Sequence, residues 1–226
     1  MERYNIFQLI HKGLRASLYQ TAVLLQQTDF TEEAETEEAL SRVKEIIMLF
    51  EAHAHKEDHF ILPAIMPFEP SVAASFEDEH VQDEELGRQL QEAITKVEKA
   101  HSHLEQLMAG RMLVFQFEAF LVFNLQHMAK EEDIINKILW RYFQDEEIKM
   151  LSARITGSVE PWMQDFYAKW MLRGINNNEV VNWFRAIEAG MPPVVFQALL
   201  QKASQELTEV RLDKIRKTLN SKLRVA

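Results

Sequence analysis

The chain of 226 residues contains no cysteine. This absence excludes disulfide bonds, metal sites built from thiolates, and iron–sulfur clusters held by thiolates of the chain itself. Glycine and proline are also scarce, with six of each. Because no segment shows the apolar–polar alternation and flanking turn residues of a strand, the sequence predicts an all-α fold.

The chain also has fewer positively charged residues than negatively charged ones. The 25 lysines and arginines are outnumbered by 35 aspartates and glutamates, which gives a net charge of −10, and we therefore expect no nucleic-acid partner. No uninterrupted apolar run reaches the ~20 residues that cross a membrane. The first residues include the charged Glu2 and Arg3 and lack the apolar core of a signal peptide. We therefore expect no membrane partner and a cytoplasmic location.

Hydrophobic residues recur at helical spacing in four long segments. The predicted helices cover residues 4–28, 37–61, 71–108 and 112–137. Pro63, Pro67 and Pro70 predict a break after the second helix. Gly110 predicts the turn between the third helix and the fourth. Helices with short connections favour an up-down-up-down four-helix bundle, which we assign to residues 1–140.

Two copies of one motif, H-x-x-x-E, offer metal-binding groups to this bundle. His53 and Glu57 form the first copy in H-A-H-K-E-D-H-F, and His127 and Glu131 form the second in H-M-A-K-E-E-D. Residues four apart lie on one face of a helix, so each copy directs an imidazole and a carboxylate to the same side. Such nitrogen and oxygen donors suit iron, manganese or zinc.

Four histidines lie on the apolar stripes of the four predicted helices: His11, His53, His80 and His127. In the antiparallel topology, their depths from one end of the bundle agree within about one helical turn. A lone histidine on such a stripe is usually an ordinary core residue. Four at one level, with two carboxylates beside them, would be costly to bury without a metal. The other histidines are interpreted as surface residues: His55, His59, His101 and His103.

This arrangement, H…H-x-x-x-E…H…H-x-x-x-E on four helices, resembles the hemerythrin-like family of HHE cation-binding domains. The segment H-A-H-K-E-D-H-F-I-L-P resembles the family's second-helix signature, with Pro63 ending the helix. The resemblance covers about residues 1–140 and implies a non-haem centre with two iron ions, while zinc and manganese stay open as other metals. It implies terminal ligands and bridging carboxylates as follows: His11, His53, His80 and His127 as terminal ligands, and Glu57 and Glu131 as bridges.

The third helix departs from the hemerythrin pattern. The resemblance implies a second histidine one turn after His80, but Glu84 stands there with Asp83 beside it. We therefore include Glu84 among the candidate ligands and expect the departure to count against reversible oxygen carriage. What the family implies is a protein that binds or reacts with oxygen, nitric oxide or peroxide, in sensing, stress response or iron handling.

Two alternatives stay open. A di-iron oxidase or iron-repair enzyme is marked by E-x-x-H on two different helices, but both copies here, Glu77/His80 and Glu98/His101, fall on one predicted helix and cannot converge. The other alternative is a helical module whose metal site is structural or empty. Whether the protein is an enzyme is left undecided.

A helical extension is predicted after the bundle. Gly157, Ser158 and Pro161 mark a boundary, and we assign the extension to residues 155–226. Its segment A-K-W-M-L-R-G-I-N-N-N-E-V-V-N-W-F resembles the tail of some longer bacterial members of the family. The extension contains no histidine, so we expect it to cover the bundle or to form a homo-oligomer contact.

Overall fold

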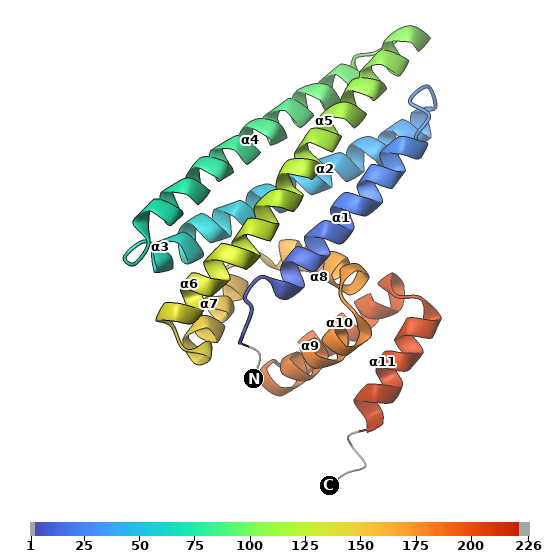
Figure 1. Cartoon of the computed structure of the whole chain (residues 1–226). Coiled ribbons are helices and arrows are strands. Elements are labelled where there is room, and N and C mark those ends of the chain that lie inside the picture. The colour runs from blue at the N-terminus through green and yellow to red at the C-terminus, as the bar shows by residue number, and fades with distance from the viewer. Residues whose placement is uncertain (1–2, 222–226) are drawn as a thin grey trace. The chain divides into compact units, whose positions relative to one another are not determined.

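The computed structural model describes residues 3–221, and no strand occurs among them, which confirms the all-α prediction. Contacts divide the chain into two compact units (Figure 1). The first comprises Ser17–Val159 with the residues up to Gln8, and the second comprises Leu9–Ala16 with the residues from Glu160 onward. The boundary after Val159 lies close to the glycine, serine and proline that mark it in the sequence.

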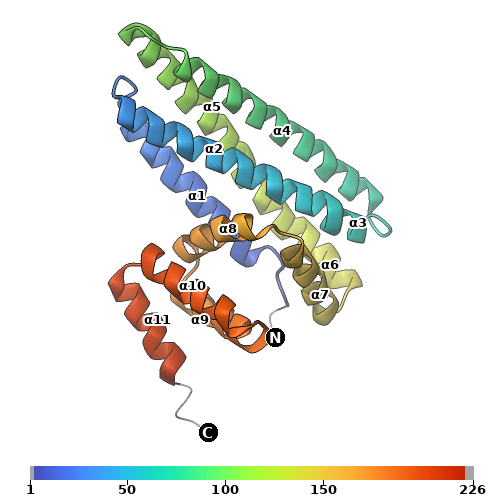
Figure 2. The ribbon, with the colours of Figure 1, turned by 180° about the vertical axis from the view of Figure 1, so that it is seen from behind.

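The first unit is built around long antiparallel helices. They are α2 (Glu33–Lys56), α4 (Pro70–Glu98), α5 (His103–Lys130) and the Ser17–Gln27 part of α1 (Gln8–Gln27). Views from the front and from behind show them as rods lying side by side (Figures 1 and 2). The rings of Phe50 on α2 and Phe120 on α5 meet edge to face, with 5.3 Å between their centroids. The helical-bundle prediction is therefore confirmed.

The inner face of α4 follows an alternation of three- and four-residue steps. Its buried residues are Ala73, Phe76, His80, Asp83, Gly87, Leu90, Ala93, Ile94 and Val97, and all of them except Ala93 fit this alternation. This spacing keeps one stripe of a helix turned toward its partners in a bundle with shallow crossing angles. The same stripe that packs the core therefore carries one histidine and one aspartate to the interior.

The turn between the third and fourth long helices is not at Gly110, as predicted, but between Glu98 and His103. There Ser102 and Glu105 form a capping box, in which each side chain accepts a hydrogen bond from the other's backbone N–H. Gly110 lies inside α5 and is buried. A Cβ atom at Gly110 would lie 2.3 Å from the ring of Phe30, so the glycine serves close packing rather than chain reversal.

The second and fourth long helices each contain a π-helical turn near the predicted end, and each continues as an α-helix beyond that end. The turn η1 (Glu57–Ile61) leads into α3 (Leu62–Ile65), and η2 (Glu131–Ile135) leads into α6 (Asn136–Tyr142). Pro63 therefore lies within α3 instead of ending the helix. The wider π turn before it displaces the carbonyl groups that a proline ring would otherwise meet, which explains why the helix continues.

The chain segments beyond the π turns close this end of the bundle. Helix α7 (Asp145–Gly157) belongs to the same unit and adds Ile148 to an apolar cluster with Phe7 and Ile65. Trp140 donates a hydrogen bond from Nε1 to the carbonyl of Tyr4 at 2.8 Å. The first unit thus extends beyond residue 140, and an apolar layer lies next to the polar interior described below.

The second unit consists of α8 (Pro161–Gly174), α9 (Asn177–Gly190), α10 (Pro193–Glu206) and α11 (Glu209–Ser221), together with the Leu9–Ala16 part of α1. Phe184 and Leu172 lie in its apolar core. Gly174 lies so close to the carbonyl of Lys12 that a Cβ atom would approach the oxygen to 2.2 Å. Arg211 donates hydrogen bonds to the carbonyls of Leu172 and Ile175.

Candidate metal centre

Four buried side chains of the first unit converge at one point: Glu57, His80, His127 and Glu131. One nitrogen or oxygen atom from each lies within 4.8 Å of all the others. His80 Nε2 is 3.1 Å from His127 Nε2 and 3.5 Å from Glu57 Oε2. His127 Nε2 is 3.4 Å from Glu131 Oε1. The structure thus brings together two imidazoles and two carboxylates contributed by three long helices.

His53 adds a third imidazole next to the same carboxylates. Its Nε2 atom lies 3.1 Å from Glu57 Oε1, one helical turn further on. Donor atoms of His53, Glu57 and Glu131 also lie within 4.8 Å of one another. Both H-x-x-x-E motifs therefore point their histidine and glutamate at the shared interior, as residues four apart on a helix should.

Two further carboxylates hold the outer nitrogens of these rings. His80 Nδ1 lies 2.6 Å from Asp58 Oδ1, and His127 Nδ1 lies 2.9 Å from Glu79 Oε2. Lys130 also donates a hydrogen bond to Glu79 at 2.8 Å. A carboxylate only accepts, so each Nδ1 donates its hydrogen, and each Nε2 turns to the interior either a lone pair, when the ring is neutral, or a second N–H, when the ring is protonated. This carboxylate–histidine pairing is the arrangement that orients histidine ligands in metal sites.

The inward-facing Nε2 atoms of His80 and His127 lie in surroundings that favour a bound cation. Two ring nitrogens with lone pairs only 3.1 Å apart repel each other, and a cation between them removes that repulsion. Burial by itself lowers the pKa of His80, but the hydrogen bond and the charge of Glu57 outweigh burial and raise the pKa to about 9. Burial likewise lowers the pKa of His127, but Glu131 and Glu57 raise it to about 10. In the absence of a metal, protons therefore supply the positive charge that this interior requires.

Comparison with known families accounts for this donor set. The profile of the hemerythrin HHE cation-binding domain matches residues 3–139, more than half of the chain. The chain belongs to the hemerythrin family. No curated protein and no solved structure matches the sequence at a significant level. Membership of the hemerythrin family and the histidine–glutamate cluster together identify the bundle as a cation-binding domain.

On the third helix the residue that turns to the interior is not the candidate ligand Glu84. Glu84 is exposed, whereas its neighbour Asp83 is buried. Asn124 on α5 donates a hydrogen bond to Asp83 Oδ1 at 2.6 Å. Burial raises the pKa of Asp83, although the Asn124 hydrogen bond and the nearby histidines act in the other direction. The three-four spacing of the core residues on α4 would have selected Asp83.

Both π turns begin at a predicted bridging carboxylate. Glu57 is the first residue of η1, and Glu131 is the first residue of η2. Single π turns within helices occur frequently at functional sites, because they re-aim side chains without ending the helix. In this hemerythrin-like bundle each π turn leads from the glutamate of an H-x-x-x-E motif into the apolar layer that follows. Nothing in the residue pattern of either motif signals the extra residue per turn.

The remaining histidines divide as follows. His11 is fully buried on α1, in the Leu9–Ala16 segment of the second unit, and its convergence with the other ligands stays a prediction. His55 and His59 are exposed and stack on each other, with 3.9 Å between their ring centroids. Sequence reasoning did not find Asp58 or Glu79, although each stands next to a predicted ligand in the sequence.

Proposed function

We propose that the centre holds two iron ions bridged by Glu57 and Glu131. The observation that carries this proposal is that two sets of potential ligands share these two carboxylates. One set adds His80 and His127, the other adds His53, and we propose that His11 completes the second set. Two sets of nitrogen donors that share two carboxylates suit a pair of metal ions better than a single ion. Zinc or manganese would satisfy the same donor types.

The proposed ligand of the iron pair is a small molecule: oxygen, nitric oxide or peroxide. Iron, when bound, supplies the redox chemistry and the open coordination positions that such a molecule needs. The chain's own residues prepare its surroundings. Asp83, held by Asn124 at 2.6 Å, offers a buried carboxyl group whose raised pKa favours proton retention. A buried proton donor stabilises a bound molecule that gains negative charge, and we place Asp83 in this role.

Asp58 and Glu79 are proposed to position the histidines rather than to touch a metal. Each accepts a hydrogen bond from an Nδ1 atom, which keeps the matching Nε2 atom directed inward. Lys130 donates a hydrogen bond to Glu79 and balances its charge beside His127. With these residues in place, the imidazoles need little rearrangement when a metal enters.

Metal analysis and spectroscopy test the proposal. The purified protein should contain two iron ions per chain, and its oxidised form should absorb in the near ultraviolet as carboxylate-bridged ferric pairs do. The ferrous protein, prepared without oxygen, should bind nitric oxide or be oxidised by oxygen or peroxide. One metal ion per chain that neither nitric oxide nor oxygen affects would instead support a structural site. A stable, reversible oxygen complex would return the protein to the carrier class.

The oxidase alternative is distinguished by turnover. Repeated cycles of iron oxidation or of substrate oxidation, measured as oxygen consumed per centre, would support an enzyme. A single stoichiometric reaction, followed by a persistent spectroscopic change, would support a sensor.

A further inference from the structure

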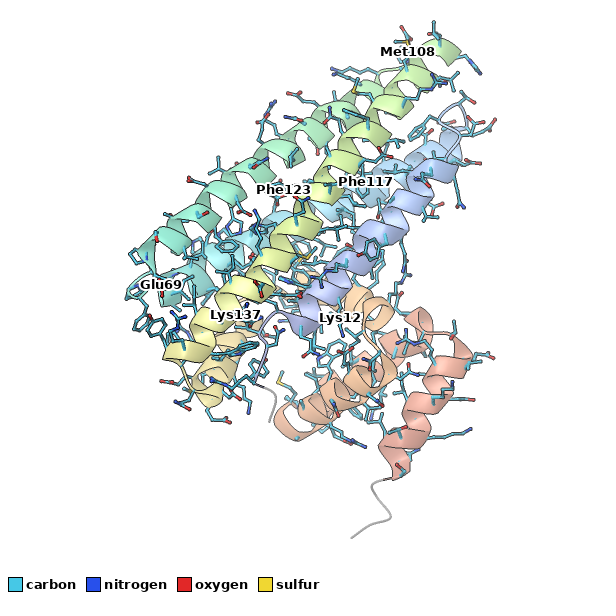
Figure 3. All side chains as sticks on the ribbon, viewed as in Figure 1. Lys12, Glu69, Met108, Phe117, Phe123 and Lys137 are labelled. Atoms are coloured by element: carbon cyan, nitrogen blue, oxygen red, sulfur yellow. The ribbon has the colours of Figure 1, made fainter. Side chains whose placement is uncertain are left out.

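Helix α5 has a second apolar face besides the one that packs the bundle. Leu113, Phe117 and Phe120 lie on the buried face. The outer stripe is formed by five large exposed residues: Leu104, Met108, Met112, Phe115 and Val122. Phe115 and Met108 each keep 64% of their surface exposed. Figure 3 shows Met108 near the N-terminal end of α5, with Phe117 and Phe123 further along the same helix.

The outer stripe makes α5 and its continuation unusually apolar. The helical stretch His103–Tyr142 has a mean hydropathy of 1.3 in its most apolar window, so by length and composition alone it would be long enough to cross a membrane. Its inner side, however, carries His127 and Glu131 to the cation-binding centre. A stripe of this kind on a folded domain marks an interaction surface.

We propose that the outer stripe is the interface of a homodimer, in which two copies of α5 pack antiparallel about a two-fold axis near Phe115. The proposal goes beyond the proposed function and holds whichever metal the centre binds. Charge is what selects a second copy of the chain as the partner. Arg111 and Glu118 are both exposed, lie seven residues apart, and flank the stripe on the same side. Neither forms an ion pair among the described residues.

Antiparallel pairing turns these two charges into complementary partners. About a two-fold axis at Phe115, residues whose numbers add up to about 230 face each other across the interface. Met108 then meets Val122 of the second copy, and Arg111 lies beside Glu118 of the second copy. Because a two-fold interface repeats every contact, two ion pairs form. A parallel two-fold arrangement would instead put this flank of the two copies on opposite sides of the interface, so that Arg111 and Glu118 would not meet.

The size of the stripe agrees with a reversible dimer. From Leu104 to Val122 the stripe runs for ~27 Å along the helix. Five side chains that each cover ~100 Å² give roughly 500 Å² per partner, or about 1,000 Å² in total. Specific interfaces begin near this size, so we expect dissociation in the micromolar range.

Disulfide cross-linking tests the pairing directly, because the chain has no cysteine of its own. Phe115→Cys in the full-length protein should form a disulfide-linked dimer under mild oxidation, since the two copies of residue 115 lie opposite each other. Leu104→Cys is the matched control: in the antiparallel pair its two copies lie ~33 Å apart and should not cross-link. A mixture of Met108→Cys and Val122→Cys proteins should give the mixed dimer. Equal cross-linking of Leu104→Cys and Phe115→Cys would overturn the antiparallel arrangement.

Molar mass in solution gives a second, independent measurement. Wild-type protein should sediment as a dimer at tens of micromolar, and Phe115→Asp should be a monomer with unchanged helical circular dichroism. Val81→Asp on α4 is the control, since Val81 is 67% exposed but lies outside the stripe. Arg111→Glu should weaken the dimer at least about tenfold, and Arg111→Glu combined with Glu118→Arg should restore it.

Other outcomes would overturn the proposal. Wild-type protein that stays monomeric at high concentration would do so, as would a dimer that persists in Phe115→Asp. Binding of the wild type to anionic vesicles, lost in Phe115→Asp, would assign the stripe to a membrane surface instead.

Discussion

The two ends of the bundle are buried by different means. At one end, Val97, Leu113 and Phe30 exclude water by apolar packing, and Gly110 lets a ring approach a helix closely. At the other end the interior holds imidazoles and carboxylates, which are costly to bury unless a cation or protons balance their charge. One end of the bundle therefore folds on apolar packing alone, whereas the other end is completed by the cation that it binds. Substitutions at the polar end should therefore lower the metal content, whereas substitutions at the apolar end should lower the stability and leave the metal content unchanged.

The largest effect is expected at a shared carboxylate. Glu131→Ala removes a fully buried group that faces His127 Nε2 at 3.4 Å and belongs to both donor sets. We expect nearly complete loss of bound metal, measured by elemental analysis of protein purified under identical conditions. Its matched control is Glu132→Ala, one residue along the helix and outside both sets. Equal metal content in the two variants would contradict a shared carboxylate.

The residues that hold the histidine rings should have an intermediate effect. Asp58→Ala and Glu79→Ala remove the acceptors of His80 Nδ1 and His127 Nδ1. Loss of such an acceptor typically weakens metal binding 10- to 100-fold, which competition with a chromophoric chelator would measure. Asp78→Ala, next to Glu79 and outside these contacts, serves as the control. Metal affinity equal to that of the wild type would show that the rings are oriented by packing alone.

At the other end of the bundle, Gly110→Ala should lower stability without removing metal. Alanine favours a helix by about 1 kcal/mol over glycine, but its Cβ atom would lie 2.3 Å from the ring of Phe30. Relief of that overlap should cost more than the propensity gain, with a net loss of about 1–2 kcal/mol in the free energy of unfolding. Chemical denaturation checks this value. Gly157→Ala is the control because no atom lies within 4 Å of its added Cβ. A more stable Gly110→Ala protein would mean that Phe30 moves aside easily.

The sequence predicts the features that spacing within one helix determines, and it does not predict those that contacts between helices determine. The histidine and glutamate of each H-x-x-x-E motif share a helical face whatever the rest of the chain does, so this local geometry followed from spacing alone. The sequence predicts a turn at Gly110 because a glycine that marks a turn and a glycine that admits a ring look alike in a single sequence. Four-residue spacing after His80 points to Glu84, whereas the core spacing of α4 includes steps of three and places Asp83 inside. Asp58 and Glu79 depend on contacts between helices, and the π turns depend on packing that no local pattern encodes.

Acidity should affect the metal-free and metal-loaded forms differently. Because the pKa values of His80 and His127 rise from 6.5 to about 9 and about 10 in the folded protein, their protonation stabilises the metal-free fold. This stabilisation is complete below about pH 6.5 and is lost as the pH rises through about 9 to 10. Bound metal takes the place of these protons, so the Tm difference between the two forms should widen between about pH 6.5 and 9. A constant difference would show that metal and protons do not compete for these rings.

The smallest effect is expected at Asp83, the aspartate beside the centre. Asp83→Asn keeps the size of the side chain and removes only its charge and its proton, whereas Glu84→Gln makes the same change on the exposed neighbour. Because Asp83 lies outside both donor sets, we expect Asp83→Asn to retain most of its metal. We expect its ferrous form to react with oxygen or nitric oxide several-fold more slowly, as follows when a buried proton donor is replaced. Stopped-flow absorbance measures these rates, and metal content is determined on the same samples. Glu84→Gln should match the wild type in both. If Asp83→Asn lost its metal, Asp83 would be a ligand. The polar interior would then extend about one helical turn further toward the apolar end of the bundle.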